Sequence, residues 1–345
     1  MKITGIRAYP IRVAEAGDGG QSESHGDESR PPVIDLGDHF IDAHAFTSIY
    51  SKFHQTTVVR VETDTGLVGW GEAQSPITPR TTRTIVEDVL APLVLGRDPF
   101  DVEAIWTRAY TAMRERGHVT GFYVDALAGV DIALWDVLGK AVGVPTHRLI
   151  GGRYRDHVPL YAGLAGRDPQ ALAQASADHV AKGYRAVKLH LREDRDGVVE
   201  IVRAVRDRVG PSIGVMVDVH MHFDVAGAIE LGRRLETLDV RWLEAPVAPD
   251  DIPGQAEIAR ALDMAVAIGE WSRTRYELRE AFERRAYDIA MPDIARTGLT
   301  EGKRIAMLAD TYNIPVSPHV GGGGIISVAA SVQYSAALPN FMILE

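Results

Sequence analysis

The sequence predicts an α/β protein whose larger part is a (β/α)8-type, TIM-like barrel. From about residue 157, short apolar segments alternate with amphipathic helical patterns to the end of the chain. Eight such segments over about 190 residues match the strand number of a (β/α)8 barrel. A doubly wound sheet is the alternative, but no G-x-G-x-x-G follows any segment, which weakens it. The expected strands are VPLYAGL, AVKLHL, IGVMVDV, VRWLEAPV, MAVAIGEW, DIAMPDI, IPVSPHV and FMILE.

The first 150 residues have a different pattern, which predicts an α+β domain. Two β-rich stretches are followed by two amphipathic helical patterns, over residues 3–13, 56–73, 81–96 and 123–143. A long polar segment rich in Gly, Ser and Asp, residues 14–32, separates the two β-rich stretches. A loop of this length in a compact domain is usually a functional lid or disordered.

The composition limits the kinds of partner. Acidic residues outnumber basic ones by 47 to 37, giving a net charge of −10 without a basic cluster, which argues against nucleic acid and anionic membranes. Cysteine is absent, so disulfides and thiolate metal sites are excluded. The amino terminus lacks the apolar core of a signal peptide, and no apolar run is long enough to span a membrane. We therefore expect a soluble, cytoplasmic protein.

Charged residues stand at the ends of the expected barrel strands. A strand that is buried on both faces should be apolar, so these charges need an explanation. In a (β/α)8 barrel, catalytic groups project from the carboxyl ends of the strands. Starting from Lys188, consecutive charged residues are separated by 30, 26, 26, 23, 26 and 26 positions. This regular separation predicts that each residue lies at a similar height along the barrel axis. The residues are Lys188 and His190, Asp218 with His220, Glu244, Glu270, Asp293, His319 and Glu345.

Three consecutive strand ends carry carboxylates, which predicts a metal site. One carboxylate in such a place is often only a helix N-cap. Asp218, Glu244 and Glu270 on adjacent strands would repel one another unless a cation lay between them. Oxygen ligands without cysteine favour Mg²⁺, with Mn²⁺ as the alternative, over the Zn²⁺ that His220-x-His222 suggests.

Basic side chains flank this predicted metal site from two directions. Lys188 and His190 lie on one side, and His319 lies on the other with Asp293 one strand away. An aspartate on the neighbouring strand can accept a hydrogen bond from the second nitrogen of the imidazole and so raise the basicity of the ring. A base beside a metal-bound carboxylate suits abstraction of an α-proton, because the metal spreads the charge of the enediolate.

These motifs together resemble the enolase superfamily in its mandelate racemase/muconate lactonizing enzyme branch. GVDIALWDVLGKAVGVPTHRLIGG is similar to the signature helix of the family, and VKLHL to its K-x-K strand. VMVDV, WLEAPV and AIGEW are similar to its metal strands, and MPDI and PVSPH to its Asp-His dyad. The resemblance covers essentially the whole chain, and it implies a Lys or His base with Mg²⁺ stabilising an enediolate.

The resemblance implies a role for each strand-end residue. Asp218, Glu244 and Glu270 would hold Mg²⁺, His319 oriented by Asp293 would be a general base, and Lys188 would match the first lysine of K-x-K. Glu345 would bond the substrate carboxylate or the enediolate. His190 replaces the second lysine of K-x-K, and its role as base, acid or substrate donor stays open. Family members continue beyond the position of Glu345, which leaves open a barrel that is incomplete at its carboxyl terminus.

The resemblance also implies two domains. Residues 1–150 would be a capping domain, with a substrate-specificity loop over about 15–50, and residues 151–345 would be the barrel. Polar side chains of that loop are candidates for contact with a polyhydroxy substrate: His25, Arg30, His39 and His44. Family members often assemble, so we expect a homo-oligomer.

The motif Asp218-Val219-His220 indicates the reaction type. Acid-sugar dehydratases of this family carry Asp-x-His on the third strand, where the histidine protonates the leaving hydroxyl. The resemblance thus implies a sugar-acid dehydratase, a hydro-lyase that takes a small-molecule carboxylate and gives a 2-keto-3-deoxy acid. A racemase, epimerase or lactone cycloisomerase with the same enediolate is the alternative. A zinc amidohydrolase and a catalytically silent metal-binding relative are the two remaining hypotheses.

Overall fold

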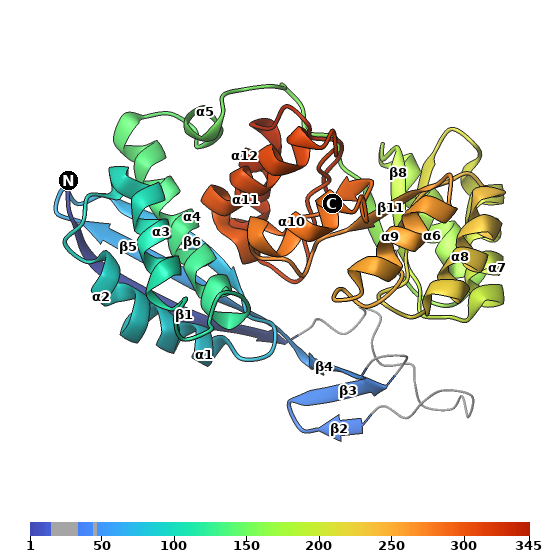
Figure 1. The fold of residues 1–345 in the computed structure, drawn as a ribbon, viewed down its shortest axis with the longest axis horizontal. Helices are drawn as coiled ribbons and strands as arrows, with labels where there is room; N and C mark the ends of the chain where they lie inside the picture. Colours follow the sequence, from blue (N-terminus) through green and yellow to red (C-terminus); the bar gives the residue numbers. More distant parts are fainter. Residues whose placement is uncertain (15–33, 44–46) are drawn as a thin grey trace.

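A computed structural model describes residues 1–14, 34–43 and 47–345. The chain forms an amino-terminal α+β capping domain and a carboxyl-terminal α/β barrel-type domain, which lie side by side in Figure 1. The expected fold class is confirmed. No helix in the described ranges is both long and apolar enough to cross a membrane.

The capping domain is built on a three-stranded antiparallel sheet in the order β1-β5-β6, with helices on one face. Its strands are β1 (Ile3–Ala14), β5 (Phe53–Thr63) and β6 (Val68–Gln74). Its helical elements are α1 (Pro79–Thr84), η1 (Ile85–Leu90), α2 (Ala91–Val94), η2 (Pro99–Asp101), α3 (Val102–Ala112), α4 (Phe122–Val142) and α5 (His147–Ile150).

Glycines in β6 let helix α4 approach the sheet. A Cβ atom on Gly69 would lie 2.1 Å from the carbonyl oxygen of Ala133, and one on Gly71 would lie 2.0 Å from that of Gly129. The sequence Gly-Trp-Gly therefore permits direct backbone contact between β6 and α4. Most of α4 is buried, and it ends at Gly143 in a left-handed conformation (φ 69°), the usual helix C-cap.

A second small sheet occupies part of the segment that the sequence predicts as a loop over about 15–50. Strands β2 (Ile34–Leu36), β3 (His39–Ala43) and β4 (Thr47–Ser51) pair in antiparallel fashion. The predicted substrate-specificity segment over about 15–50 thus contains strands from Ile34 onward, where β-branched and aromatic residues favour them. The sheet projects below the rest of the molecule in Figure 1.

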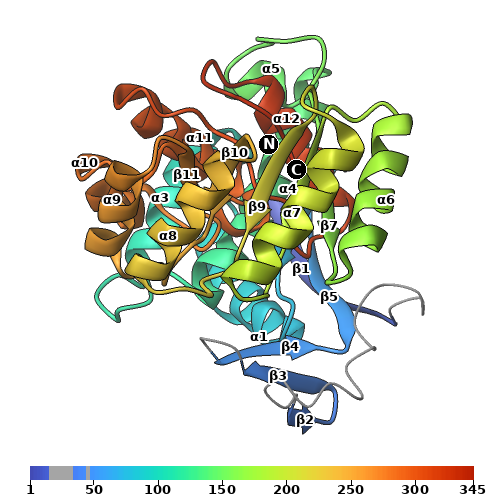
Figure 2. The ribbon, with the colours of Figure 1, turned by 90° about the vertical axis from the view of Figure 1, so that its right-hand side faces the viewer.

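The barrel-type domain has six parallel strands in sequence order, and Figure 2 shows helices covering their outer side. The strands are β7 (Ala162–Ala165), β8 (Ala186–His190), β9 (Gly214–Asp218), β10 (Val240–Glu244), β11 (Ala265–Ile268) and β12 (Ile289–Ala290). The helices are α6 (Pro169–Ala181), α7 (Arg195–Val209), α8 (Val225–Glu236), α9 (Ile252–Ala261), α10 (Arg275–Glu283), α11 (Ile294–Thr311) and α12 (Ile325–Ala336).

The seventh and eighth expected strands form isolated parallel bridges instead of continuous strands. Val316 bridges Ala290 on one side and Phe341 on the other, and Leu344 bridges Leu160. Proline at 315 and 318 cannot donate a backbone hydrogen bond, which explains why the ladder is interrupted. The bridge between Leu344 and Leu160 joins the last segment to the first, so the eight segments form a closed ring.

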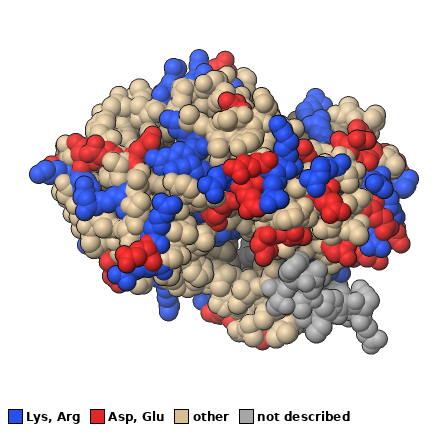
Figure 3. Space-filling view, in the orientation of Figure 1, with Lys and Arg blue, Asp and Glu red and all other residues tan. Residues whose placement is uncertain are grey.

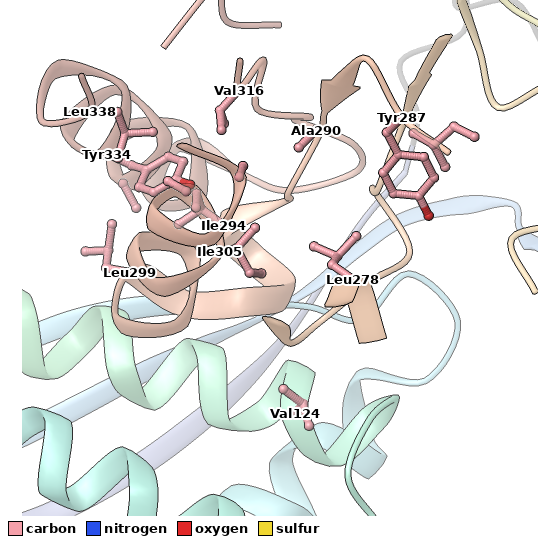
Figure 4. Packing of buried hydrophobic residues seen from close by; sticks show 14 of the residues in the cluster. Val124, Leu278, Tyr287, Ala290, Ile294, Leu299, Ile305, Val316, Tyr334 and Leu338 are labelled. Atoms are coloured by element: carbon pink, nitrogen blue, oxygen red, sulfur yellow. The ribbon is translucent and has the colours of Figure 1, made fainter. Parts of the chain in front are cut away.

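An apolar core extends across both domains. Val124 of α4 belongs to the same buried cluster as Leu278 of α10, Ile305 of α11 and Tyr334 of α12, which Figure 4 shows from close by, and all four side chains are fully buried. On the surface, Lys and Arg are interspersed with Asp and Glu over the face shown in Figure 3. Burial of this continuous core fixes the capping domain against the barrel.

Candidate active site

The strand-end residues that the spacing singled out lie at one end of the barrel. The parallel register aligns His190 with Asp218 and Asp218 with Glu244. A parallel bridge likewise aligns Asp293 with His319. In-register positions of parallel strands share the same height, so these side chains meet at the carboxyl ends of the strands.

Lys188 lies at the centre of the first half of the site. Its ammonium nitrogen Nζ is 2.8 Å from Glu244 Oε1 and 2.9 Å from Glu345 Oε1, and the side chain is fully buried. Burial alone would lower the pKa of Lys188, but Glu244 and its other acidic neighbours raise it well above its ordinary value. Lys188 is therefore a charged group that holds two carboxylates together.

His190 is bound to the carboxylate of Asp218. The distance from Nδ1 to Asp218 Oδ2 is 2.8 Å, and Nε2 is 3.7 Å from Glu345 Oε1. Burial opposes the charge on the imidazole, but the hydrogen bond to Asp218 and the nearby Glu345 carboxylate outweigh it and raise the pKa of His190 to about 9. In this arrangement His190 is a hydrogen-bond donor.

His319 lies between two carboxylates in the second half of the site. Its Nδ1 is 2.9 Å from Asp293 Oδ2, and its Nε2 is 2.6 Å from Glu270 Oε2. Burial would lower the pKa of His319, but Glu270, Glu345 and Asp293 raise it well above the ordinary value. Asp293 also caps helix α11 by accepting from the Ala295 backbone N–H, so one carboxylate both starts the helix and orients the imidazole.

Glu345 connects the two halves. One of its oxygens accepts from Lys188, and the other accepts from the backbone N–H of Val320 at 2.9 Å and lies 3.8 Å from His319 Nε2. Burial opposes its charge, but Lys188 and His319 lower the pKa of Glu345 well below its ordinary value. The side chain is thus an anion with its oxygens facing both basic groups.

His220 lies immediately beyond the end of β9 in an unusual backbone conformation. Its φ is 43° and that of Met221 is 62°, a left-handed pair without glycine. The backbone N–H of His220 donates to Asp218 Oδ1 at 2.8 Å, which stabilises this turn. Positive φ in a residue with a side chain costs energy and is typical of functional sites.

The small sheet of the capping domain contacts this histidine. The Tyr50 hydroxyl, on β4, lies 3.2 Å from His220 Nε2, and Arg192 donates to the same hydroxyl at 2.9 Å. The Trp271 ring lies edge-on to the imidazole at 5.8 Å. Burial lowers the pKa of His220 below its ordinary value. The spacing of the strand-end residues does not predict Tyr50, Arg192 or Trp271, because each is an isolated residue on a separate segment.

The chemistry of the donor set fits a hard divalent cation. Asp218, Glu244 and Glu270 are 2%, 1% and 6% exposed, and Glu270 Oε1 is buried without a hydrogen-bond partner in the described part of the chain. Each carboxylate is bound to a basic side chain, and no three His, Asp or Glu groups among residues 1–14, 34–43 and 47–345 are already grouped as metal ligands. A bound cation would compete with His190, Lys188 and His319 for these carboxylates.

The four predicted substrate contacts of the amino-terminal loop have different positions. His25, Arg30 and His44 lie outside the described residues. His39 lies on β3, where Nε2 is 3.0 Å from the carbonyl oxygen of Ile77. The structure therefore links His39 to the backbone of the capping domain.

The loop after His319 contains four consecutive glycines, Gly321 to Gly324, and its backbone packs too closely for larger side chains. A Cβ atom on Gly321 would lie 2.1 Å from His319 Cε1, and the Gly321 N–H donates to Asp293 at 3.3 Å. Gly324 donates to Glu72 of the capping domain. The backbone amides of this run thus approach carboxylates of the protein itself.

Comparisons with known proteins agree with this architecture. Residues 170–345 match the family described as enolase C-terminal domain-like, and residues 43–151 match the mandelate racemase/muconate lactonizing enzyme N-terminal domain. D-galactarolactone cycloisomerase from Agrobacterium fabrum is 34% identical, covering 88% of this chain and 81% of the relative. D-xylonate dehydratase from Haloferax volcanii is 36% identical, covering 84% and 74%.

A solved structure of an enolase superfamily member from Agrobacterium tumefaciens superimposes with a TM-score of 0.92 at 30% identity, covering 100% of this chain and 87% of that one. The relatives include both the predicted enzyme class, a hydro-lyase, and the alternative, an isomerase. Enzymes of this superfamily use Mg²⁺. The chain belongs to the enolase superfamily, in its mandelate racemase/muconate lactonizing enzyme branch.

Proposed function

We propose that the chain is a Mg²⁺-dependent dehydratase of a sugar acid. The observation that carries the proposal is the placement of two histidines beside one acidic cluster. His319 lies 2.6 Å from Glu270 and is held by Asp293, while His220 follows Asp218 and is bonded to it through its backbone. A base and an acid on one cluster are the two groups that elimination of water requires.

Asp218, Glu244 and Glu270 would hold the Mg²⁺ ion. When bound, the ion supplies positive charge that stabilises the enediolate form of the substrate carboxylate. The pairing of Glu270 with His319 bears on the charge of the base, because Glu270 is the largest contribution that raises the pKa of His319. A cation held by Glu270 would offset this negative charge, which would favour the neutral imidazole that a base requires.

The proton transfers follow from the positions of the two histidines. Nε2 of His319 takes the proton from C2 of the sugar acid while Asp293 holds Nδ1. His220 gives a proton to the C3 hydroxyl, which leaves as water as the C2–C3 double bond forms. The enol product then takes a proton at C3 and loses the proton of its C2 hydroxyl, which gives the 2-keto-3-deoxy acid. Glu345 and the charged Lys188 face the substrate carboxylate or the enediolate from the other half of the site.

The substrate class is a small acid sugar. Five carboxylates and four basic groups line the barrel mouth, a polar site suited to hydroxyl and carboxylate groups: Asp218, Glu244, Glu270, Asp293 and Glu345 with Lys188, His190, His220 and His319. D-xylonate dehydratase, 36% identical, acts on such a compound by its name. His25, Arg30, His39 and His44 remain our candidates for contacts with hydroxyl groups of the substrate.

A cycloisomerase is the second candidate, because the 34% identical relative from Agrobacterium fabrum is a D-galactarolactone cycloisomerase. The same base and ion would serve it, but an oxygen within the substrate would be expelled instead of water.

A substrate screen separates these candidates. Purified protein is incubated with Mg²⁺ and a library of aldonic acids, aldaric acids and their lactones, and 2-keto acids are detected with semicarbazide. Dehydration predicts a semicarbazone for at least one acid, which His319→Asn abolishes. A semicarbazone from a lactone but from no open-chain acid would support the cycloisomerase, because expulsion of the ring oxygen also leaves an enol. Racemisation of an α-hydroxy acid with no keto acid would contradict the dehydratase.

A further inference from the structure

We propose that Glu72 of the capping domain is a positioning residue for His319. It lies on β6, outside the barrel, and it holds the loop over residues 320–324 that packs on the imidazole. The inference rests on the proposed function in one respect, that His319 is the base. Glu72 itself is not expected to contact the substrate.

Glu72 is a buried carboxylate whose partners come from both domains. Its exposed fraction is 1%. It accepts from the Gly324 backbone N–H, from the Ser327 backbone N–H at 2.9 Å, and from the Thr56 hydroxyl at 2.7 Å. Burial of a carboxylate is costly unless such donors satisfy it. The two backbone donors lie at the start of helix α12, where the helix dipole also favours an anion.

The loop held by Glu72 is in contact with His319. A Cβ atom on Gly321 would lie 2.1 Å from Cε1 of the imidazole, so the backbone lies directly against the ring. The N–H of Val320 donates to Glu345, and that of Gly321 donates to Asp293. Because these two carboxylates also face His319, displacement of the loop would disturb both the ring and its partners.

A second residue of β6 holds the same loop. Gln74 donates through Nε2 to the Gly321 carbonyl oxygen, and it is 5% exposed. Glu72 and Gln74 are two positions apart on one strand and therefore point to the same side of the sheet. The edge of the capping sheet thus contacts the loop at both ends, at Gly321 and at Gly324.

Two neighbouring barrel segments have comparable contacts with the capping domain. Asp125 of α4 is 2.9 Å from Arg273, three positions after Glu270. Asp131 of α4 accepts from the Thr300 N–H at 2.9 Å in the helix that Asp293 begins. Buried carboxylates of the capping domain therefore contact the segments that follow Glu270, Asp293 and His319 in turn. Glu72 is the one whose loop touches the imidazole.

The first test replaces Glu72 by Gln in the full chain. An amide has the same shape, but only one of its two ends can accept a backbone N–H. We expect kcat to fall roughly tenfold to a hundredfold, the usual effect of losing a partner behind an active-site group. KM should change little, because the substrate-binding groups remain. Asp136→Asn is the matched control, since Asp136 accepts from the Trp70 N–H of the same strand and from Lys140, both within the capping domain.

A second readout does not require turnover. In protein labelled with ¹⁵N-histidine, Glu72→Gln should shift or broaden the imidazole signals of His319, and Asp136→Asn should not. Amide hydrogen exchange at Gly324 and Ser327 should accelerate in the same variant. Thr56→Val, which removes one hydrogen bond to Glu72 and keeps the side-chain shape, should produce smaller changes of the same kind even if Glu72→Gln does not fold.

The outcomes separate this proposal from the proposed function. An unchanged kcat and unchanged His319 signals in a folded Glu72→Gln protein would overturn the positioning role. An equal effect of Asp136→Asn would also overturn it, since that result would indicate general loosening of β6. If the wild-type protein dehydrates no acid sugar, the proposed function fails, but the His319 signals still decide whether Glu72 positions the ring.

Discussion

The pH dependence of stability should reveal the buried carboxyl group of Asp131. This side chain is 1% exposed on α4, accepts from the Thr300 N–H at 2.9 Å, and lies 2.5 Å from the Thr300 hydroxyl. These two contacts link the carboxylate of this capping-domain helix to the barrel. Burial raises the pKa of Asp131 from 3.8 to about 7, although the bonds to Thr300 oppose the shift.

The sign of the effect follows from this raised pKa. The folded chain binds the Asp131 proton more tightly than the unfolded chain does. Stability from this group is therefore complete below about pH 4 and is lost as the pH rises to about 7, above which the loss is constant. Between pH 5 and pH 8 the loss amounts to about 3 kcal/mol at about 1.4 kcal/mol per pH unit.

Asp131→Asn removes the titrating group and should remove that part of the pH dependence. Urea unfolding of the wild type and the variant, followed by tryptophan fluorescence at pH 5 and pH 8, measures the difference. The variant should become more stable relative to the wild type by about 3 kcal/mol at the higher pH. Asp136→Asn, on the same helix but with a partly exposed side chain, is the control for a general effect of replacing an aspartate there. An equal pH dependence in the wild type and Asp131→Asn would refute the assignment of a raised pKa to this carboxyl group.

Four further predictions concern the reaction. His319→Asn should lower turnover by about 10² to 10⁴, the usual contribution of a general base, and should stop exchange of the substrate C2 proton in D₂O measured by NMR; retained exchange would exclude His319 as the base. His220→Gln should stop release of water while C2 exchange continues, and loss of both would argue against a role confined to the leaving group. Chelation with EDTA should abolish activity and Mg²⁺ or Mn²⁺ should restore it, whereas full activity in the chelated protein would contradict the metal site. Tyr50→Phe removes the hydroxyl that lies 3.2 Å from His220 and should lower kcat by about tenfold with the proton-transfer groups in place; an unchanged kcat would show that the contact has no role in turnover.

Much of the barrel could be predicted because its pattern is local. Apolar segments and amphipathic helices alternate along the chain, and the carboxyl ends of parallel strands meet at one edge. The spacing of Asp218, Glu244 and Glu270 predicts that they meet at one end of the barrel, and the register of β9 with β10 aligns Asp218 with Glu244. The apolar segment that contains the prolines at 315 and 318 predicts a continuous strand, whereas the structure has isolated bridges there.

The composition of the site beyond the strand ends is less predictable. Tyr50 and Glu72 come from the capping domain, and neither belongs to a repeating pattern that would mark it. The small sheet from Ile34 to Ser51 reads as a loop in the sequence, because the polar residues before it dominate the segment. The Tyr50 side chain of this sheet reaches His220 because the two domains pack against each other.

Residue type and regular spacing are enough to predict the barrel, the acidic strand ends and the family. The base that each carboxylate contacts, and the capping residues that hold the loops behind them, become visible in the folded protein alone. These contacts join residues that are far apart in the chain: Tyr50 and His220 are 170 positions apart, and Glu72 and Ser327 are 255 apart. No local propensity carries information over such distances, whereas packing of the shared apolar core brings the partners within hydrogen-bonding distance.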